Sequence, residues 1–190
     1  ATFGRAFEGG KTVSALALFH VLDRALIAGN HLLARAARRA VGAVGKWSEE
    51  TLKNCADHMT HISEHFYCGE VDRSVAAHVA QIPDRIRAKA EAHRRYRQTM
   101  PGLADKDIRI AMDEWNYWYG PHVFGELGTR YFLKDALGIA AGLNELARNS
   151  DLYFMANYAQ TVNVIGCIKT TKTEAFLSAT ALPLMLYRQQ

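Results

Sequence analysis

The chain has 190 residues, of which 49% are hydrophobic and 22% are charged. This balance is typical of a globular domain with a sizeable core, and it excludes intrinsic disorder, collagen and small disulfide scaffolds. Lys and Arg outnumber Asp and Glu by 23 to 19. The resulting net charge of +4 is too small to indicate a nucleic-acid-binding protein.

The cysteines and the apolar stretches indicate a reducing compartment and no membrane. Cys55, Cys68 and Cys167 are odd in number and widely spaced, so neither a disulfide framework nor a structural zinc site is expected. A cytoplasmic protein is therefore predicted. The most apolar early stretch, residues 13–28, is interrupted by a histidine and two charged residues, so we expect neither a membrane span nor a signal peptide.

Residues 1–11 are Gly-rich and predict no element, whereas the Ala/Leu/Arg-rich residues 12–39 predict two helices with a turn at Gly29-Asn30 between them. The apolar run at residues 40–45 is either a buried strand or the end of the preceding helix. Ser48, followed by two glutamates, predicts the N-cap of a short helix that ends near Asp57.

The remainder alternates strands with long helical patterns, which predicts parallel strands with helices packed outside them. Pro83 is expected to break the first long helix or to begin a new one. The ends of parallel strands carry functional groups in such folds, so the strand ends are where chemistry is expected. The predicted strands are 60–67, 107–115 and 152–158, the helices are 74–98, 129–148 and 173–188, and the loops are 116–128 and 161–173.

The segment IAMDEWNYWY, residues 110–119, carries the strongest chemical signal. Asp113 and Glu114 are neighbours on a strand, so they should point to opposite faces and need partners from other strands. Four aromatic residues follow (Trp115, Tyr117, Trp118 and Tyr119), and they could form a wall for the apolar face of a sugar ring. The alternative is that Asp113 caps a helix or forms an ion pair and that the aromatic rings fill the core.

Two other strand ends carry polar side chains. His65 and Tyr67 are two residues apart and so share a strand face, where either could hydrogen-bond a sugar or orient a carboxylate. Asn157 and Gln160 follow the last predicted strand and can both donate and accept. For each of these residues, a purely structural role remains the alternative.

The sequence gives less support to a phosphate-binding loop, a metal site or a nucleic-acid surface. Residues 9–12 (GGKT) lack the spacing of a phosphate-binding loop. His58 and His61 have no third ligand spaced to join them, so no metal and no cofactor are expected. Six basic residues between positions 85 and 97 are interpreted as a solvated helix face rather than a nucleic-acid surface.

Several long blocks, in the same order, resemble glycoside hydrolase family 51, the α-L-arabinofuranosidases. The resemblance covers about residues 41–188 and corresponds to the second half of the catalytic barrel of that family. The blocks are VGAVGKWSEETLKNCADH, ISEHFYCG, AHVAQIPDRIRAKAEAHRRYR, IRIAMDEWNYWYG and FMANYAQTVNVIG.

The resemblance implies an α/β fold made of part of a (β/α)8 (TIM) barrel, with about four βα units in residues 41–190. Residues 1–40 would be an unmatched N-terminal helical segment. The strands at 41–45, 60–67, 107–115 and 152–158 would be the last four of the barrel. A complete barrel typically needs roughly 250 residues, so this chain is too short to close one alone.

The resemblance also implies roles for individual residues. Glu114 would be the catalytic nucleophile, and Tyr67 would hydrogen-bond near it or to the sugar. The remaining substrate-binding residues would be His65, Trp115, Asn116 and Gln160. The family places its acid/base glutamate in a Gly-Asn-Glu motif, whereas the only Gly-Asn here, Gly29-Asn30, is followed by His31. No residue of this chain is therefore assigned that role.

Two hypotheses follow. In the first, the chain is a retaining glycosidase that releases terminal arabinofuranosyl groups from arabinan or arabinoxylan oligosaccharides, without cofactor, membrane or nucleic acid. In the second, it is a catalytically incomplete barrel that binds sugar or acts as an assembly module. Open strand edges favour pairing, so an oligomer or a complementary half-barrel is the expected partner.

Overall fold

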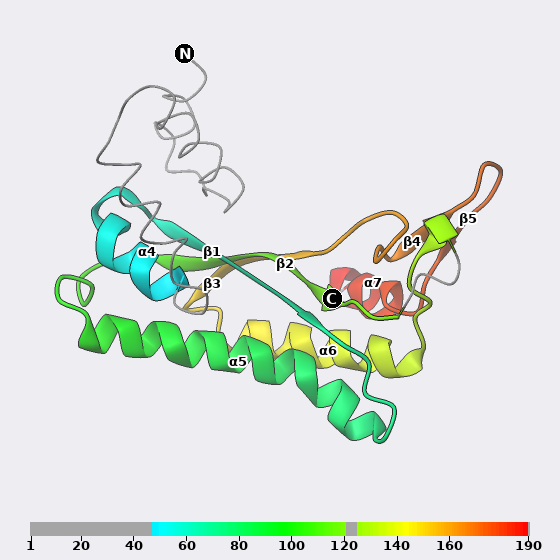
Figure 1. The fold of residues 1–190 in the computed structure, drawn as a ribbon, viewed down its shortest axis with the longest axis horizontal. Helices are drawn as coiled ribbons and strands as arrows, with labels where there is room; N and C mark the ends of the chain where they lie inside the picture. The colour runs from blue at the N-terminus through cyan, green and yellow to red at the C-terminus, as the bar shows by residue number, and fades with distance from the viewer. Residues whose placement is uncertain (1–46, 121–124, 190) are drawn as a thin grey trace, which may run out of the picture. The chain divides into compact units, whose positions relative to one another are not determined.

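The structure, a computed structural model, describes residues 47–120 and 125–189 (Figure 1). The predicted helical lead-in over 1–40 and the apolar run at 40–45 lie outside these residues. Within the described ranges, no helix is both long enough and apolar enough to cross a membrane.

Helices and strands alternate along the described chain, and three strands form one sheet in the order β1-β2-β3. A second, two-stranded sheet pairs β4 with β5. The elements are α4 (Trp47–Cys55), η1 (Ala56–His58), β1 (His61–Cys68), α5 (Val75–Thr99), β2 (Arg109–Tyr117), η2 (Gly125–Leu127), α6 (Leu133–Arg148), β3 (Tyr153–Tyr158), β4 (Ile168–Thr170), β5 (Ala175–Leu177) and α7 (Ala181–Gln189).

The strands of the larger sheet run parallel, which confirms the predicted α/β architecture. Hydrogen bonds at the carboxyl ends of the strands join neighbours in register: Trp118 N donates to Cys68 O over 2.9 Å, and Ala159 N donates to Trp115 O over 3.3 Å. The run from Ile110 to Met112 on β2 is completely buried. A continuous buried run of this kind is typical of a parallel strand covered on both faces.

The chain divides into two compact units, and the first contains the described residues 47–64 together with 92–111. Its interior includes Leu52 and a buried polar cluster around Glu64. His93 Nε2 lies 2.9 Å from Glu64 Oε1, and the Ser48 hydroxyl donates to the same carboxylate oxygen. The prediction that Ser48 caps the helix is therefore wrong, because α4 already begins at Trp47 and the hydroxyl is used in this tertiary contact.

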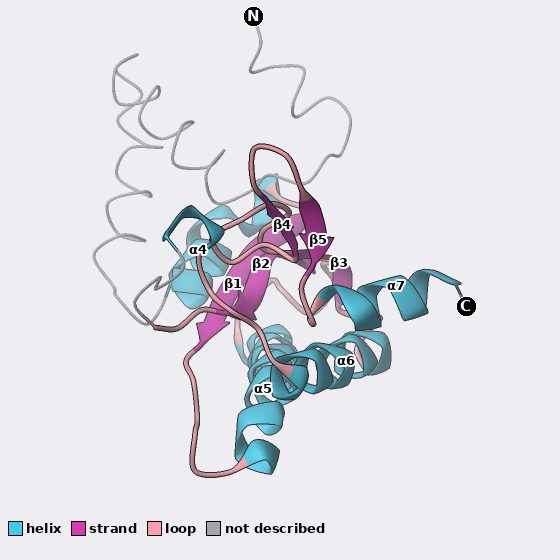
Figure 2. Ribbon diagram, turned by 90° about the vertical axis from the view of Figure 1, so that its right-hand side faces the viewer, coloured by secondary structure: helices cyan, strands magenta, loops and turns pink. Residues whose placement is uncertain are grey.

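The second unit contains residues 65–91 together with 112–189. Within it, α6 and residues 75–91 of α5 lie on the same side of the strands, as Figures 1 and 2 show. Ile82 and Ile86 of α5, Ile139 of α6 and the ring of Trp115 are completely or almost completely buried and supply its core. Burial of a large apolar side chain contributes about 1.5–3 kcal/mol, so these residues dominate the stability of the unit.

Two glycines let α6 approach its neighbours closely, Gly138 toward β2 and Gly142 toward α5 and β2. A Cβ atom at Gly138 would lie 2.0 Å from the hydroxyl oxygen of Tyr117, and one at Gly142 would lie 2.5 Å from Cγ2 of Ile82. No side chain fits at these distances. The Tyr117 hydroxyl uses the space to donate to the carbonyl oxygen of His78 over 2.8 Å, which ties β2 to α5.

The long helix continues through Pro83, contrary to the predicted break. A proline inside a helix removes one backbone hydrogen bond and costs about 3 kcal/mol. Ile82 and Ile86 flank it and are completely buried, so packing offsets this cost. The second strand is shifted by two residues from the predicted range, because β2 begins at Arg109 and includes Asn116 and Tyr117.

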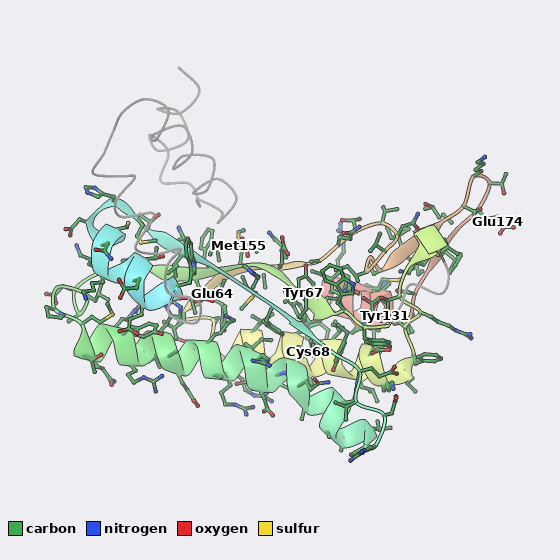
Figure 3. All side chains as sticks on the ribbon, viewed as in Figure 1. Glu64, Tyr67, Cys68, Tyr131, Met155 and Glu174 are labelled. Atoms are coloured by element: carbon green, nitrogen blue, oxygen red, sulfur yellow. The ribbon has the colours of Figure 1, made fainter. Side chains whose placement is uncertain are left out.

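The predicted loop at 161–173 and the start of the predicted helix at 173 are both wrong, since a β-hairpin occupies this region. Lys169 pairs with Phe176, and Glu174 lies in the connecting turn (Figure 3). In the turn, Glu174 N donates to Thr171 Oγ1 over 3.1 Å. Strands of three residues are too short to show a periodicity, and the final helix, α7, begins only at Ala181.

Candidate active site

A cavity of about 480 Å³ opens within the second unit, at the carboxyl ends of its strands. This is where parallel α/β folds gather functional side chains. Residues near the ends of β1 and β2 form part of the wall, and the segment after β3 forms the rest. The lining residues are Tyr67, Asp113, Glu114, Trp118, Tyr158, Ala159, Gln160, Thr161, Val164 and Ile165.

Tyr67 and Glu114 meet in this cavity. The Tyr67 hydroxyl donates to Glu114 Oε2 over 2.7 Å. Burial raises the pKa of Tyr67, and the hydrogen bond to Glu114 raises this pKa further, so the phenol stays protonated and remains a donor. Figure 3 shows Tyr67 and Cys68 on opposite sides of β1, as strand alternation requires.

Asp113 and Glu114 both contribute to the cavity wall but differ in environment. Glu114 is exposed, whereas Asp113 Oδ1 is buried. His65 Nδ1 lies 3.9 Å from Asp113 Oδ1, and the His65 side chain is 57% exposed. His65 is not among the cavity-lining residues, so the structure places it beside Asp113 and outside the cavity wall.

Of the four aromatic residues that follow Glu114, only Trp118 lines the cavity. Its side chain is among the exposed large hydrophobic groups, and its ring meets that of Tyr67 edge-on at 5.2 Å. Trp115 and Tyr117 are buried, at 1% and 0% exposure. The ring of Trp115 packs in the core, and its role in a sugar subsite stays a prediction.

Asn116 is also buried, at 0% exposure, and does not line the cavity. β2 continues through Asn116 into the interior, and its contact with substrate stays a prediction. Gln160 does line the cavity, and its Nε2 donates to the carbonyl oxygen of Val162 over 3.0 Å. Asn157 is exposed outside the cavity.

Three further wall residues, Thr161, Val164 and Ile165, were not singled out from the sequence. All three lie in the block FMANYAQTVNVIG, so the resemblance pointed to the segment but not to these side chains. In the described part of the chain, no group of three or more His, Cys, Asp or Glu side chains could hold a metal ion.

The structure also contains a buried His–Asp pair that was not predicted from the sequence. His78 Nε2 lies 2.8 Å from Asp135 Oδ1, and both side chains are completely buried. Val71 N donates to His78 Nδ1, so the proton is on Nε2 and points at the carboxylate. Asp135 Oδ2 accepts from Phe132 N and from the Tyr119 hydroxyl. The pair caps the start of α6 and joins it to α5, which is a structural role.

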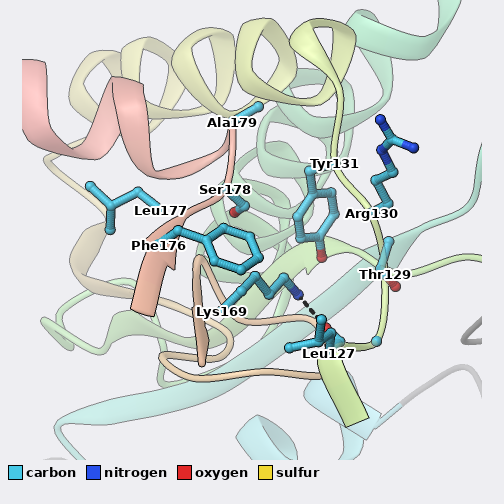
Figure 4. A pocket seen from close by; sticks show the side chains of 10 residues that line it. Leu127, Thr129, Arg130, Tyr131, Lys169, Phe176, Leu177, Ser178 and Ala179 are labelled. Atoms are coloured by element: carbon cyan, nitrogen blue, oxygen red, sulfur yellow. Dashed lines mark hydrogen bonds between the residues drawn. The ribbon is translucent and has the colours of Figure 1, made fainter. Parts of the chain in front are cut away.

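A second cavity, of about 320 Å³, lies between the β4–β5 hairpin and the segment before α6 (Figure 4). Lys169, Tyr131 and Phe176 line it. The Lys169 ammonium donates to the carbonyl oxygen of Leu127 over 2.8 Å and to that of Val164 over 3.1 Å. Burial lowers the pKa of Lys169 to about 8.

Comparison with known proteins connects this fold and cavity to one family. Residues 113–190 match the family model described as "Alpha-L-arabinofuranosidase C-terminal domain". The chain is 42% identical over 90 residues to the probable alpha-L-arabinofuranosidase C of Aspergillus clavatus, covering 45% of this chain and 18% of that relative. It is 28% identical over 150 residues to the intracellular exo-alpha-(1->5)-L-arabinofuranosidase of Halalkalibacterium halodurans, covering 66% of this chain and 28% of that relative.

Solved structures agree. The α-L-arabinofuranosidase of Thermotoga maritima, solved with arabinose, aligns with a TM-score of 0.66 at 28% identity, covering 74% of this chain and 28% of that chain. The GH51 α-L-arabinofuranosidase of Thermotoga petrophila RKU-1 aligns with a TM-score of 0.62 at 30% identity and the same coverage. The chain thus resembles the C-terminal part of GH51 α-L-arabinofuranosidases, and it spans under a third of the length of these relatives.

Proposed function

We propose that this chain, similar to the C-terminal part of GH51 α-L-arabinofuranosidases, carries the nucleophile half of a retaining glycosidase site in a partial (β/α)8 barrel. Glu114 would be the nucleophile, and terminal arabinofuranosyl groups of arabinan or arabinoxylan oligosaccharides would be the substrates. One observation carries the proposal: an exposed carboxylate at the carboxyl end of a parallel strand lines a cavity and accepts a hydrogen bond from Tyr67.

The first chemical step is a displacement at the anomeric carbon. A carboxylate oxygen of Glu114 attacks that carbon, the bond to the leaving oxygen breaks, and a covalent glycosyl ester forms. Tyr67 holds the carboxylate in one orientation, which lowers the entropy lost on reaching the transition state. Trp118 offers an apolar face beside the carboxylate, and Gln160 offers an amide that can donate to a sugar hydroxyl.

Both steps need a group that we do not assign to this chain. In a retaining enzyme, another carboxyl group about 5–5.5 Å from the nucleophile protonates the leaving oxygen and then activates water to release the sugar. The relatives are more than three times as long as the matched region. We therefore propose that the acid/base comes from chain beyond the half-barrel or from a partner, and that this chain alone forms the glycosyl ester faster than it hydrolyses it.

Covalent trapping tests the nucleophile without requiring the acid. A fluorinated aryl arabinofuranoside with a dinitrophenolate leaving group needs little protonation, so the ester should form and persist. Intact-mass and peptide analysis should find one adduct, on Glu114, and none in Glu114→Gln. A matched control, Glu174→Gln, changes an exposed carboxyl on the hairpin turn and should label like the wild type. An unlabelled wild type, or an adduct elsewhere, overturns the proposal.

The second candidate is a non-catalytic sugar-binding or assembly module. In the described residues, β1 and β3 are the outer strands of the three-stranded sheet, and strand edges favour pairing. This candidate predicts binding of arabino-oligosaccharides without any covalent adduct, and association of two copies in sedimentation.

A cytoplasmic location belongs to our proposal as well, and it is supported by the intracellular relative named above.

A further inference from the structure

Asn116 lies two residues beyond Glu114 on β2, and its side chain is completely buried. Its Nδ2 is 2.6 Å from the carbonyl oxygen of Ala159 and 2.7 Å from that of Ile165. It is also 3.0 Å from the Tyr131 hydroxyl oxygen. One buried amide group therefore reaches two points of the segment that follows β3.

The orientation of this amide is determined by its other end. Tyr117 N donates to Asn116 Oδ1 over 2.7 Å, so the oxygen faces the backbone of β2 and the NH₂ group faces the carbonyl oxygens. The reverse orientation would place the amide oxygen against the carbonyl oxygens of Ala159 and Ile165. Buried polar atoms need such complementary partners, because a buried donor or acceptor without one loses the hydrogen bonds that it makes to water in the unfolded chain.

The two carbonyl groups bracket a wall of the cavity. Gln160, Thr161 and Val164 lie between Ala159 and Ile165, and all five residues line the cavity that contains Glu114. The two N–H bonds of Asn116 thus connect the strand that carries the carboxylate to both ends of the opposing wall segment, residues 159–165.

Tyr131 completes the connection. Its hydroxyl lies 2.7 Å from the carbonyl oxygen of Tyr117 and 3.0 Å from that of Ile165, and it is buried. Burial raises the pKa of Tyr131, so this phenol also stays protonated. The carbonyl groups of Ala159 and Ile165 lie outside any regular strand. Asn116 and Tyr131 serve as their hydrogen-bonding partners in place of water.

We infer that Asn116 is a positioning residue, which holds residues 159–165, with Gln160 among them, in register with Glu114. The inference rests on the proposed function for its catalytic consequence, but the mechanical part stands on the contacts alone. A misplacement of about 1 Å can reduce an enzymatic rate about 100-fold. Loss of this amide should therefore impair the site by more than its effect on stability implies.

The variants are Asn116→Ala, Asn116→Asp and the control Tyr153→Phe. Asn116→Ala removes both donors. Asn116→Asp keeps the shape and the oxygen that Tyr117 N contacts, but puts a carboxylate against two carbonyl groups. Tyr153→Phe removes another buried hydrogen bond, from Tyr153 to the carbonyl oxygen of Ile86, at the end of β3 opposite to the wall segment.

Hydrogen exchange of the full chain tests the mechanical part. In Asn116→Ala, amides within residues 159–165 should exchange at least about tenfold faster than in the wild type, while Tyr153→Phe leaves that segment unchanged. Equal exchange of 159–165 in Asn116→Ala and Tyr153→Phe overturns the inference, whether or not the wild type reacts with sugar. This arm does not depend on Glu114 being a nucleophile.

The rate of covalent labelling of Glu114 tests the catalytic part, measured where each variant is folded. Asn116→Ala should label about 10- to 100-fold more slowly than the wild type, and Tyr153→Phe should label at the wild-type rate. Labelling of Asn116→Ala at the wild-type rate overturns the inference. A wild type that does not label at all overturns the proposed function instead, and the exchange measurement then decides the inference.

Asn116→Asp adds a signature that a merely structural role would not produce. Burial raises the pKa of a carboxyl group, and its protonated form regains one O–H donor. The labelling rate of Asn116→Asp relative to the wild type should therefore rise as the pH falls. A ratio that stays constant across pH, with both proteins folded, contradicts the positioning role.

Discussion

The hydroxyl of Tyr67 donates to Oε2 of Glu114 over 2.7 Å, although the two residues are 47 positions apart in sequence. They meet because β1 and β2 are parallel neighbours and both side chains lie near the carboxyl ends of their strands. A donor held by one strand against a carboxylate on the next orients that carboxylate without placing a charge beside it. This contact is the core of the candidate site, and the first prediction depends on it.

Replacing Tyr67 by Phe should slow covalent labelling of Glu114 by about 10- to 100-fold, since loss of a preorganised donor in an active site typically has effects of this size or larger. The ring and its contact with Trp118 remain, so the free energy of unfolding should change by less than about 1.5 kcal/mol. Tyr187→Phe, which loses a surface hydrogen bond to Asn144, is the control for both measurements. Equal labelling rates in Tyr67→Phe and Tyr187→Phe would contradict the assigned contact.

The His78–Asp135 pair predicts a large effect on stability. Asp135→Ala leaves three donors without their acceptor: His78 Nε2, the Tyr119 hydroxyl and Phe132 N at the start of α6. An unpaired buried donor costs about 1–3 kcal/mol, so the free energy of unfolding should fall by at least about 3 kcal/mol. Asp84→Ala disrupts an exposed ion pair with Arg87 and should cost less than about 1 kcal/mol. Urea denaturation of both variants checks the difference, and losses of similar size would refute the structural role of the pair.

Gly138→Ala should destabilise the protein, although alanine is favoured over glycine in a helix by about 1 kcal/mol. The added Cβ would lie 2.0 Å from the Tyr117 hydroxyl oxygen, so α6 must move away from β2 or the hydrogen bond to His78 must break. A loss of about 1–3 kcal/mol is expected from such overpacking. Leu137→Ala, at an exposed position of the same helix, is the control. A more stable Gly138→Ala would show that the two elements are not in close contact.

Lys169 predicts a pH-dependent difference in stability. Its pKa is lowered from 10.5 to about 8 in the folded chain, so between about pH 8 and 10.5 the unfolded state binds more protons. The stability of the wild type relative to Lys169→Met should therefore rise as pH increases through this window. Below about pH 8 the difference should be constant. Thermal unfolding of both proteins at a series of pH values checks the sign. A stability difference that shifts in favour of Lys169→Met as the pH rises would contradict it.

Much of the fold was accessible from sequence because its signals are local. The alternation of apolar strands with long helical patterns predicted the parallel α/β arrangement, and β1, α5 and β3 lie within about two residues of the expected ranges. The packing of Ile82 and Ile86 around Pro83 is not a local signal. The helix was therefore expected to break where tertiary contacts keep it intact. The β4–β5 hairpin was missed for a related reason, since three-residue strands form only when a partner is adjacent.

The candidate site, like the fold, was predictable from the sequence only in part. The sequence by itself determined which residue types lie at or just after the ends of the strands: a carboxylate at Glu114, a phenol at Tyr67 and an amide at Gln160, all of which line the cavity. Only the tertiary structure decided which way the neighbouring side chains face. Trp115 and Asn116 are as polar or aromatic as their neighbours, yet both are buried. Burial depends on what α5, α6 and the segment after β3 bring against β2, and that is a property of the packed fold rather than of the motif.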